Sequence, residues 1–205
     1  MDARDLHVDH AVEALGLFCE LAPWAAGFEI NVSCPNLAVG GAACGSTPEG
    51  AAEVMRACRR VTTKPLFVKM APSRVPEVAR ALEAEGADGL TVINSIPGMA
   101  IDVRRRRSKL SRPTGGLSGP LLHPIAVRMV WEAARAVDIP ICGVGGIMTG
   151  EDAAEFILAG ATCVSVGMAN LVDPVASARI LDELEAWTES QGVSDINDLV
   201  GALEA

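Results

Sequence analysis

Short apolar segments alternate with longer amphipathic segments along most of this 205-residue chain. The short segments are rich in Val and Ile and have no polar face, which is typical of parallel strands that are buried on both sides. The longer segments have helical spacing, and several begin with Pro or with acidic residues. We predict strands at Phe28–Cys34, Leu66–Met70, Gly89–Asn94, Ile141–Gly146 and Cys163–Met168, and helices at Leu6–Leu21, Pro48–Val61, Val75–Glu85, Pro124–Ala136, Gly150–Ala159 and Val175–Ser190.

This alternation predicts an α/β fold made of successive βα units. Gly86 and Gly160 each stand just before a predicted strand, which indicates a helix end followed by a short loop. A complete (β/α)8 TIM barrel has eight strands and typically ~250 residues. We therefore expect an incomplete barrel, namely its C-terminal five or so βα units, with residues 1–205 forming a single partial domain. An open, flavodoxin-like sheet of five strands is the alternative fold.

The charge balance excludes some kinds of partner. The net charge is −9, and the basic residues gather mainly at Arg104–Arg107 and Lys109. A nucleic-acid surface needs a broad basic face, so we interpret this cluster as a solvated loop, with a docking patch for an acidic partner as the alternative. No apolar run approaches the ~20 residues of a spanning helix, and Met1–Asp5 does not resemble a secretory signal. We expect a cytoplasmic protein that binds neither membrane nor nucleic acid.

The six cysteines show neither a CxxC pair nor a histidine at metal-ligand spacing. We therefore predict no metal site and no disulfide framework, and we interpret the cysteines as reduced thiols. His123 precedes Pro124 at a predicted helix start, where a structural role is expected.

Polar residues gather around one thiol where the first predicted strand ends. The segment Glu29–Asn36 passes from strand positions into Asn31, Ser33, Cys34 and Asn36. In parallel α/β folds the carboxyl ends of the strands carry the chemistry. Cys34 is therefore a candidate acid/base or nucleophile, and a small buried thiol is the alternative interpretation.

Glycines follow each of the last two predicted strands, in Gly143–Gly146 and at Gly167. Glycine lets backbone N–H groups approach a phosphate closely, and the helix predicted to begin near Thr149 adds a favourable dipole. Two such ends on consecutive strands predict a phosphorylated cofactor or substrate, whereas tight turns alone are the alternative.

Lys69 is unusual because it stands near the end of an apolar strand. The chain has three lysines and 14 arginines, and Lys69 lies within Leu66–Met70. A charge there is costly unless it meets an anion. We expect Lys69 to point into a binding site, and the alternative is a lysine that reaches solvent at the strand edge.

Five ordered motifs resemble the catalytic subunits of the dihydroorotate dehydrogenase family, and the resemblance extends from about Phe28 to Leu203. A cysteine instead of a serine at the base position is similar to the soluble class 1 enzymes. The loop Val39–Gly45 most resembles the class 1B, NAD-linked type. The motifs are Asn31–Asn36, Phe67–Pro72, Asp88–Ser95, Thr114–Gly119 and Gly143–Thr149.

The resemblance implies oxidation of dihydroorotate to orotate in de novo pyrimidine (UMP) biosynthesis, with FMN as the cofactor. It implies that Cys34 removes the C5 proton while hydride leaves C6 for FMN N5, and that the loop after Cys34 closes as a lid. It implies that Asn31, Asn36, Asn94 and Ser95 hydrogen-bond the pyrimidine.

The resemblance also implies how FMN is held. Lys69 would lie beside the flavin N1/O2 edge and stabilise negative charge there. The other implied FMN-lining residues, of which the last four would act chiefly at the phosphate, are Ser118, Gly119, Gly143, Gly145, Gly146, Gly167 and Met168.

The implied partner is an electron-transfer subunit that carries FAD and an iron–sulfur cluster, in a homodimer or heterotetramer. The family's first strands have no counterpart before Phe28. Cys44 stands where class 1B enzymes usually have Phe, a feature shared with dihydropyrimidine dehydrogenases, although Asn36 replaces their histidine. A dihydropyrimidine dehydrogenase-like pyrimidine reduction and a truncated, non-catalytic remnant are therefore the alternative functions.

Overall fold

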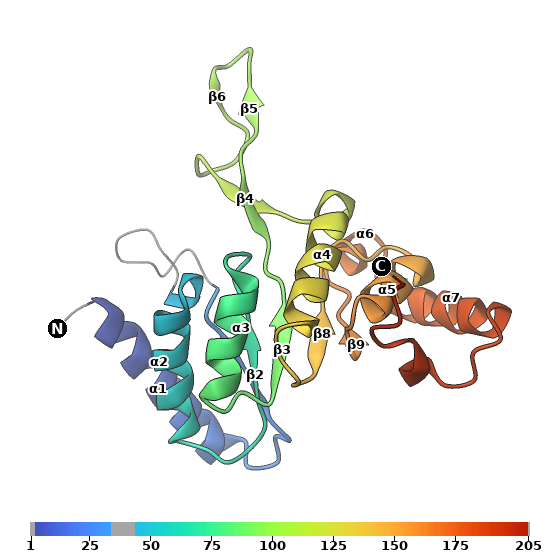
Figure 1. Ribbon diagram of the computed structural model, residues 1–205. Coiled ribbons are helices and arrows are strands. Elements are labelled where there is room, and N and C mark those ends of the chain that lie inside the picture. The colour runs from blue at the N-terminus through green and yellow to red at the C-terminus, as the bar shows by residue number, and fades with distance from the viewer. Residues whose placement is uncertain (1–2, 34–43, 205) are drawn as a thin grey trace.

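Five strands of the computed structural model form one parallel sheet, and their order in space follows their order along the chain (Figure 1). The structure describes residues 3–33 and 44–204. Parallel neighbours need a crossover connection, and a helix lies in each one. The strands are β1 (Phe28–Asn31), β2 (Leu66–Lys69), β3 (Gly89–Val92), β8 (Ile141–Gly143) and β9 (Cys163–Val164).

The helices pack side by side on one face of this sheet. α1 contacts α2, and the contacts continue from α2 to α3, α3 to α4, α4 to α5, and α5 to α7. A flavodoxin-like sheet has a strand order of 2-1-3-4-5 and helices on both faces, so that alternative is wrong and the sheet is an arc of a (β/α)8 barrel. The helices are α1 (Ala3–Leu21), α2 (Pro48–Arg59), α3 (Val75–Ala84), α4 (His123–Ala134), α5 (Gly150–Leu158), α6 (Ala169–Val172) and α7 (Ala176–Ser190).

The two faces of the sheet differ because side chains alternate along each strand. Leu66, Val68, Leu90 and Ile141 are at most 2% exposed beneath the helices, and burying each such side chain contributes roughly 1.5–3 kcal/mol. The opposite face is the inner face of the arc. Register partners on neighbouring strands place five residues in one row of that face, which we call the inner row: Asn31, Lys69, Thr91, Cys142 and Cys163.

The predicted elements are confirmed, with changes at their ends. Each of the five predicted strands begins at the predicted residue but ends earlier, because the chain leaves the sheet to form the loops at its carboxyl edge. Gly86 and Gly160 follow helices with φ of 88° and 114°, which is the left-handed helix ending expected from the sequence. Thr149 and Asp152 cap α5 reciprocally, with Thr149 Oγ1 accepting from Asp152 N at 3.1 Å.

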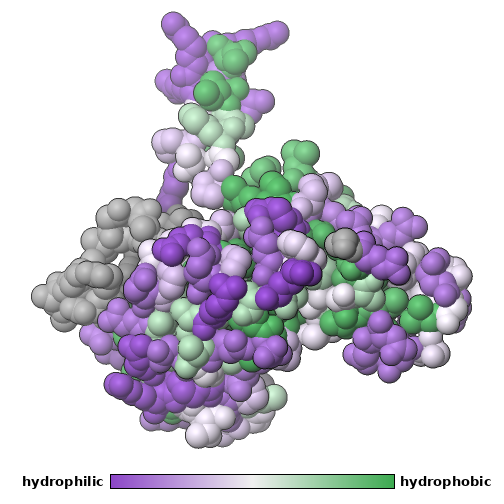
Figure 2. Space-filling view, in the orientation of Figure 1, coloured by the Kyte–Doolittle hydropathy of each residue, from purple (hydrophilic) through white to green (hydrophobic). Residues whose placement is uncertain are grey.

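Residues 96–117 form two antiparallel strand pairs that the sequence analysis did not predict. β4 (Ile96–Gly98) pairs with β7 (Gly115–Leu117), and β5 (Ile101–Asp102) pairs with β6 (Arg107–Ser108). This arm projects far from the body of the molecule (Figure 1), and toward its tip hydrophilic residues surround a few hydrophobic ones, such as Val103, which is 80% exposed (Figure 2). The basic cluster is exposed, as expected, but it belongs to a hairpin rather than to a plain loop.

Short 3-10 turns complete the described chain: η2 (Cys44–Ser46), η3 (Pro120–Leu122) and η4 (Ile196–Leu199). Among the described helices, none has both the length and the apolar character needed to cross a membrane.

Candidate functional site

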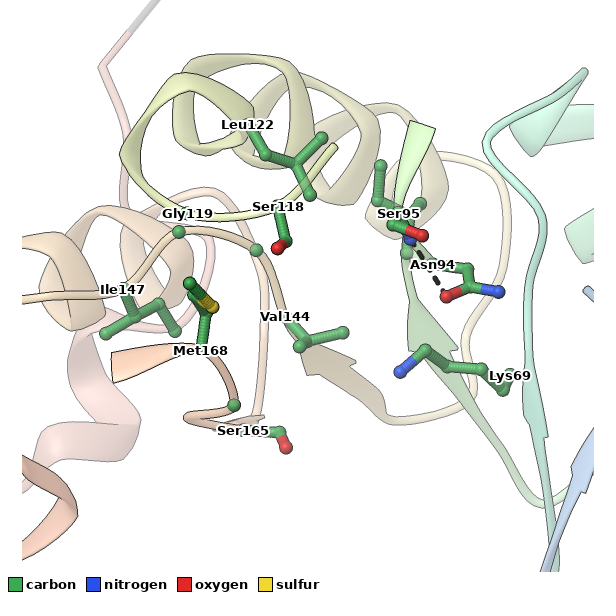
Figure 3. A pocket seen from close by; sticks show the side chains of 14 residues that line it. Lys69, Asn94, Ser95, Ser118, Gly119, Leu122, Val144, Ile147, Ser165 and Met168 are labelled. Atoms are coloured by element: carbon green, nitrogen blue, oxygen red, sulfur yellow. Dashed lines mark hydrogen bonds between the residues drawn. The ribbon is translucent and has the colours of Figure 1, made fainter. Parts of the chain in front are cut away.

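A pocket of about 170 Å³ opens at the carboxyl ends of β2, β3, β8 and β9 (Figure 3). This is the edge of the sheet where parallel α/β folds bind their ligands. Nine residues predicted from the sequence line it: Lys69, Asn94, Ser95, Ser118, Gly119, Gly145, Gly146, Gly167 and Met168. The other lining residues are Ile93, Leu122, Val144, Ile147 and Ser165.

Lys69 brings a positive charge into this pocket. It is the last residue of β2, it is half-buried, and its amine points into the pocket (Figure 3). The inner-face carboxylate of Glu29 accepts a hydrogen bond from the Thr91 hydroxyl. Within the described parts of the chain Lys69 has no carboxylate partner. A partly buried cation without a partner favours an anionic ligand.

Asn94, Ser33 and Asn31 form a hydrogen-bonded chain across the carboxyl ends of β1 and β3. Asn94 Nδ2 donates to Ser33 Oγ at 2.9 Å, and Ser33 Oγ donates to Asn31 Oδ1 at 2.6 Å. Asn94 Oδ1 accepts the backbone N–H of Ser95 at 2.9 Å. These bonds fix the orientation of both amides. Fixed amides are suited to recognising a planar ring that carries several donors and acceptors.

The turn after β8 requires glycine for both conformational and steric reasons. Gly146 has φ of 70°, and a Cβ there would lie 2.5 Å from the carbonyl oxygen of Gly119. A Cβ on Gly145 would lie 2.5 Å from Ala126 Cβ. Side chains larger than hydrogen are therefore excluded, and the backbone itself forms this wall of the pocket.

Two turns that line the pocket contain backbone N–H groups without a hydrogen-bond partner in the described chain. Among the described residues, no hydrogen bond uses the backbone N–H of Gly145, Gly146, Gly167 or Met168. Unpaired N–H groups in adjacent turns form a concavity that binds anions. The pocket thus has free backbone donors in the turns after β8 and β9, and a lysine amine where β2 ends.

The amino end of α5, from which the sequence predicts a favourable dipole for a phosphate, has backbone donors that are already bonded within the chain. Gly150 N donates to Glu183 Oε2 at 2.8 Å, and Met148 N donates to Asp152 Oδ2 at 2.8 Å. Hydrogen bonds from Arg179 and from the Gly150 backbone hold the pKa of Glu183 below its usual range. Carboxylates of the chain itself therefore occupy this helix end, and an anionic ligand would depend on the loop donors.

Four predicted site residues lie elsewhere or cannot be placed. Asn31 is in the inner row and reaches the pocket only through Ser33 and Asn94. Gly143 is buried on the helix side of the sheet, where a Cβ would lie 2.6 Å from the Phe156 ring. The candidate base Cys34 and the candidate substrate-binding residue Asn36 lie outside the described residues.

Sequence reasoning missed Ser165 and Val144, which line the pocket. Each stands two residues after an inner-row cysteine, so strand alternation could have placed both on the inner face.

His123 packs against the glycine turn after β8. Its backbone N would lie 2.9 Å from a Cβ on Gly146, its ring packs edge-on against Phe156, and its Nε2 is 3.3 Å from Glu155 Oε2.

Comparisons with known proteins agree on one family. The model of the dihydroorotate dehydrogenase family matches residues 7–187. The chain is 52% identical over 184 residues to the "Dihydroorotate dehydrogenase B (NAD(+)), catalytic subunit" of Trichlorobacter lovleyi and 51% identical over 177 residues to the protein of the same name from Porphyromonas gingivalis. These alignments cover 89% and 85% of this chain but 60% and 58% of the relatives.

A comparison with solved structures agrees with this family at the level of the fold. A crystal structure of DHODH from Eimeria tenella in complex with ferulenol aligns with a TM-score of 0.77 at 24% identity. The alignment covers 95% of this chain and 57% of that one, so the likeness concerns the fold, and the arc of five strands matches part of a barrel. The chain spans about 60% of the length of the curated relatives that it matches. Because the family model covers most of its residues, this protein belongs to the dihydroorotate dehydrogenase family.

Proposed function

We propose that this chain is the FMN-binding part of a cytoplasmic dihydroorotate dehydrogenase of the class 1B, NAD-linked type, which oxidises dihydroorotate to orotate in pyrimidine biosynthesis. Relatives that are about half identical in sequence carry that name. The structural observation that carries the proposal is the pocket, in which the Lys69 amine and the unpaired N–H groups of two glycine turns are available to one anionic ligand.

The residues of the pocket fit FMN. The N–H groups at Gly145, Gly146, Gly167 and Met168 would hold the phosphate, because they form a concavity that no side chain fills. Lys69 would hold negative charge on the isoalloxazine ring. Ser118 and Gly119 line the same wall. When bound, FMN would supply the hydride acceptor for C6 of dihydroorotate.

The residues after β1 and β3 would bind and deprotonate the substrate. Asn94 and Ser95 would hydrogen-bond the pyrimidine directly, together with Asn36, while Asn31 would keep the Asn94 amide in position through the Ser33 bridge. Cys34 would remove the C5 proton. It follows Ser33 directly in the sequence, and the Ser33 hydroxyl accepts a hydrogen bond from the Asn94 amide that would bind the substrate.

We further propose that residues 1–205 belong to one FMN-binding domain and form part of its barrel. One continuous hydrophobic core joins the helices to the outer face of the sheet. The relatives are named as catalytic subunits, so the proposed partner is an electron-transfer subunit that carries FAD and an iron–sulfur cluster. The proposed assembly is a homodimer or a heterotetramer.

Ligand titration tests the cofactor assignment. Quenching of flavin fluorescence should show that FMN binds more tightly than riboflavin, which lacks the phosphate. Gly146→Ala should remove that preference, since its Cβ would collide with the Gly119 carbonyl. Equal affinity for FMN and riboflavin would contradict the phosphate site.

Formation of orotate from dihydroorotate by the FMN-loaded protein tests the activity. An electron acceptor such as ferricyanide replaces the proposed partner in this assay. The same measurement should be made on any longer in-frame product of the gene, because a complete barrel typically needs ~250 residues. An FMN-loaded protein that forms no orotate in either version would favour a non-catalytic remnant.

A further inference from the structure

Cys142 and Cys163 are direct neighbours in the inner row. Cys142 on β8 is the register partner of Cys163 on β9, and the two strands are parallel. Register partners of a parallel pair point to the same face of the sheet, and neighbouring strands lie about 4.8 Å apart. A disulfide needs Cα atoms roughly 4.4–6.8 Å apart. The Cα spacing expected for these register partners therefore falls within the range that a disulfide requires.

The two thiols differ in their surroundings. Cys163 is exposed and Cys142 is half-buried. Burial, followed by the charge and hydrogen bond of Cys163, raises the pKa of Cys142 to about 12. Cys142 is therefore protonated at neutral pH, and Cys163 is the more exposed thiol of the pair.

The other described cysteines have no such arrangement. Cys19 lies on α1, Cys44 on η2 and Cys58 in the buried face of α2, and none of them belongs to a strand of the sheet. Within residues 3–33 and 44–204, only Cys142 and Cys163 are placed side by side by strand register.

We propose that Cys142 and Cys163 form a redox-sensitive dithiol that hydrogen peroxide converts to an intramolecular disulfide joining β8 to β9. In the first step the Cys163 sulfur attacks peroxide. An S–O bond forms, the O–O bond breaks, and the departing hydroxide takes the thiol proton, which gives one water and a sulfenic acid on Cys163. The Cys142 sulfur then attacks the Cys163 sulfur. The S–S bond forms, the S–O bond breaks, and hydroxide leaves as a second water with the Cys142 proton. The two thiols lose two electrons, and these reduce one peroxide to two waters.

The dithiol also lies close to the pocket. Val144 and Ser165, which follow Cys142 and Cys163 by two residues and stand just beyond the ends of β8 and β9, line the pocket. The dithiol thus lies directly beneath the pocket wall.

Peptide mapping of the peroxide-treated, 205-residue protein tests this proposal. After free thiols are blocked with N-ethylmaleimide, cleavage next to Glu151 and Glu155 separates Cys142 from Cys163. We expect a pair of peptides joined only by the Cys142–Cys163 bond and released by dithiothreitol. Cys142→Ala and Cys163→Ala should each abolish the joined pair, while Cys19→Ala, which removes a thiol outside the sheet, should retain it.

An equal mixture of ¹⁵N-labelled and unlabelled protein shows whether the bond is intramolecular without relying on any variant. Joined peptides should carry either both labels or neither. Mixed-label pairs would overturn the proposal, and so would separate alkylation of Cys142 and Cys163 after peroxide treatment, or pairing of either cysteine with a different one.

Discussion

The side-chain amide of Asn94 donates a hydrogen bond of 2.9 Å to the hydroxyl of Ser33, which lies 61 residues earlier in the chain. The bond passes over the end of β2, because β1 and β3 flank that strand in the sheet. Ser33 in turn bonds Asn31. Three side chains from two separate motifs therefore hold one another in position at the edge of the sheet where the pocket opens.

Asn94→Ala should raise the KM for dihydroorotate more than it lowers kcat. The variant removes an amide that Ser33 and the Ser95 backbone hold in place, and losing a buried hydrogen-bonding partner costs about 1 to 3 kcal/mol, or roughly 5- to 150-fold. Steady-state kinetics of the FMN-loaded protein measure this effect. Asn197→Ala, which alters an exposed amide bonded to Asp195, is the control. An unchanged KM in the Asn94 variant would contradict a substrate contact.

Cys34→Ser should lower turnover at neutral pH by orders of magnitude while FMN stays bound. A serine hydroxyl is a far weaker base than a thiolate in a site adapted to sulfur. Turnover and the flavin absorbance of the same sample measure the two properties separately. Cys44→Ala should have a small effect, and a larger loss in that variant than in Cys34→Ser would transfer the base role to Cys44.

Lys69→Ala should make bound FMN harder to reduce and leave binding of its phosphate largely intact. Removing a nearby cation destabilises the negatively charged reduced ring, and at an effective dielectric constant of about 20 two unit charges 4 Å apart interact by roughly 4 kcal/mol. A part of this energy should appear as a lower midpoint potential in a redox titration. Lys109→Ala, on the projecting arm, is the control and should keep the parent potential. An equal potential in both variants would mean that Lys69 does not contact the flavin.

Gly146→Ala should lose FMN affinity and should lose more stability than Gly192→Ala. Both glycines have φ of 70°, but a Cβ on Gly192 meets nothing within 4 Å while one on Gly146 meets the Gly119 carbonyl at 2.5 Å. The left-handed conformation alone costs about 1–2 kcal/mol, so the difference between the variants isolates the steric clash. Thermal unfolding and FMN titration measure the two effects. Equal losses of stability would show that the turn can adjust to a side chain.

Stability should fall as the pH rises above about 9, in part because of Cys58. Burial raises the pKa of the Cys58 thiol from its ordinary value of 9.0 to about 11. Between these values the unfolded chain releases the thiol proton and the folded chain retains it, so raising the pH favours unfolding. Cys58→Val should reduce this decline in melting temperature between pH 8 and pH 11. A decline as steep as in the parent would mean that the Cys58 thiol does not contribute.

Much of the fold could be predicted from the sequence, because the residue patterns that indicate strands and helices are local. Strand starts such as Leu66 and Ile141 agree with the structure, since apolar runs and helix-starting residues such as Pro48 act within a few positions of themselves. Lys69 and the glycine turns could be predicted as site residues for the same reason, because a charge and several small residues occur locally at the ends of apolar strands. Residues 96–117 gave no such signal, because strands of two or three residues that contain Pro97, Gly98 and Gly115 lack a periodic pattern.

The sequence by itself determined the βα units, their order and the residue types at the strand ends, since these depend on neighbours along the chain. Only the tertiary structure decided which of those residues meet. Strand register turned Gly143 toward Phe156 and placed Cys142 beside Cys163. Packing of α7 put Glu183 at the start of α5, where the sequence predicted a dipole that favours a phosphate. These pairings join residues far apart in the chain, and one step of strand register would reverse the face on which each residue lies.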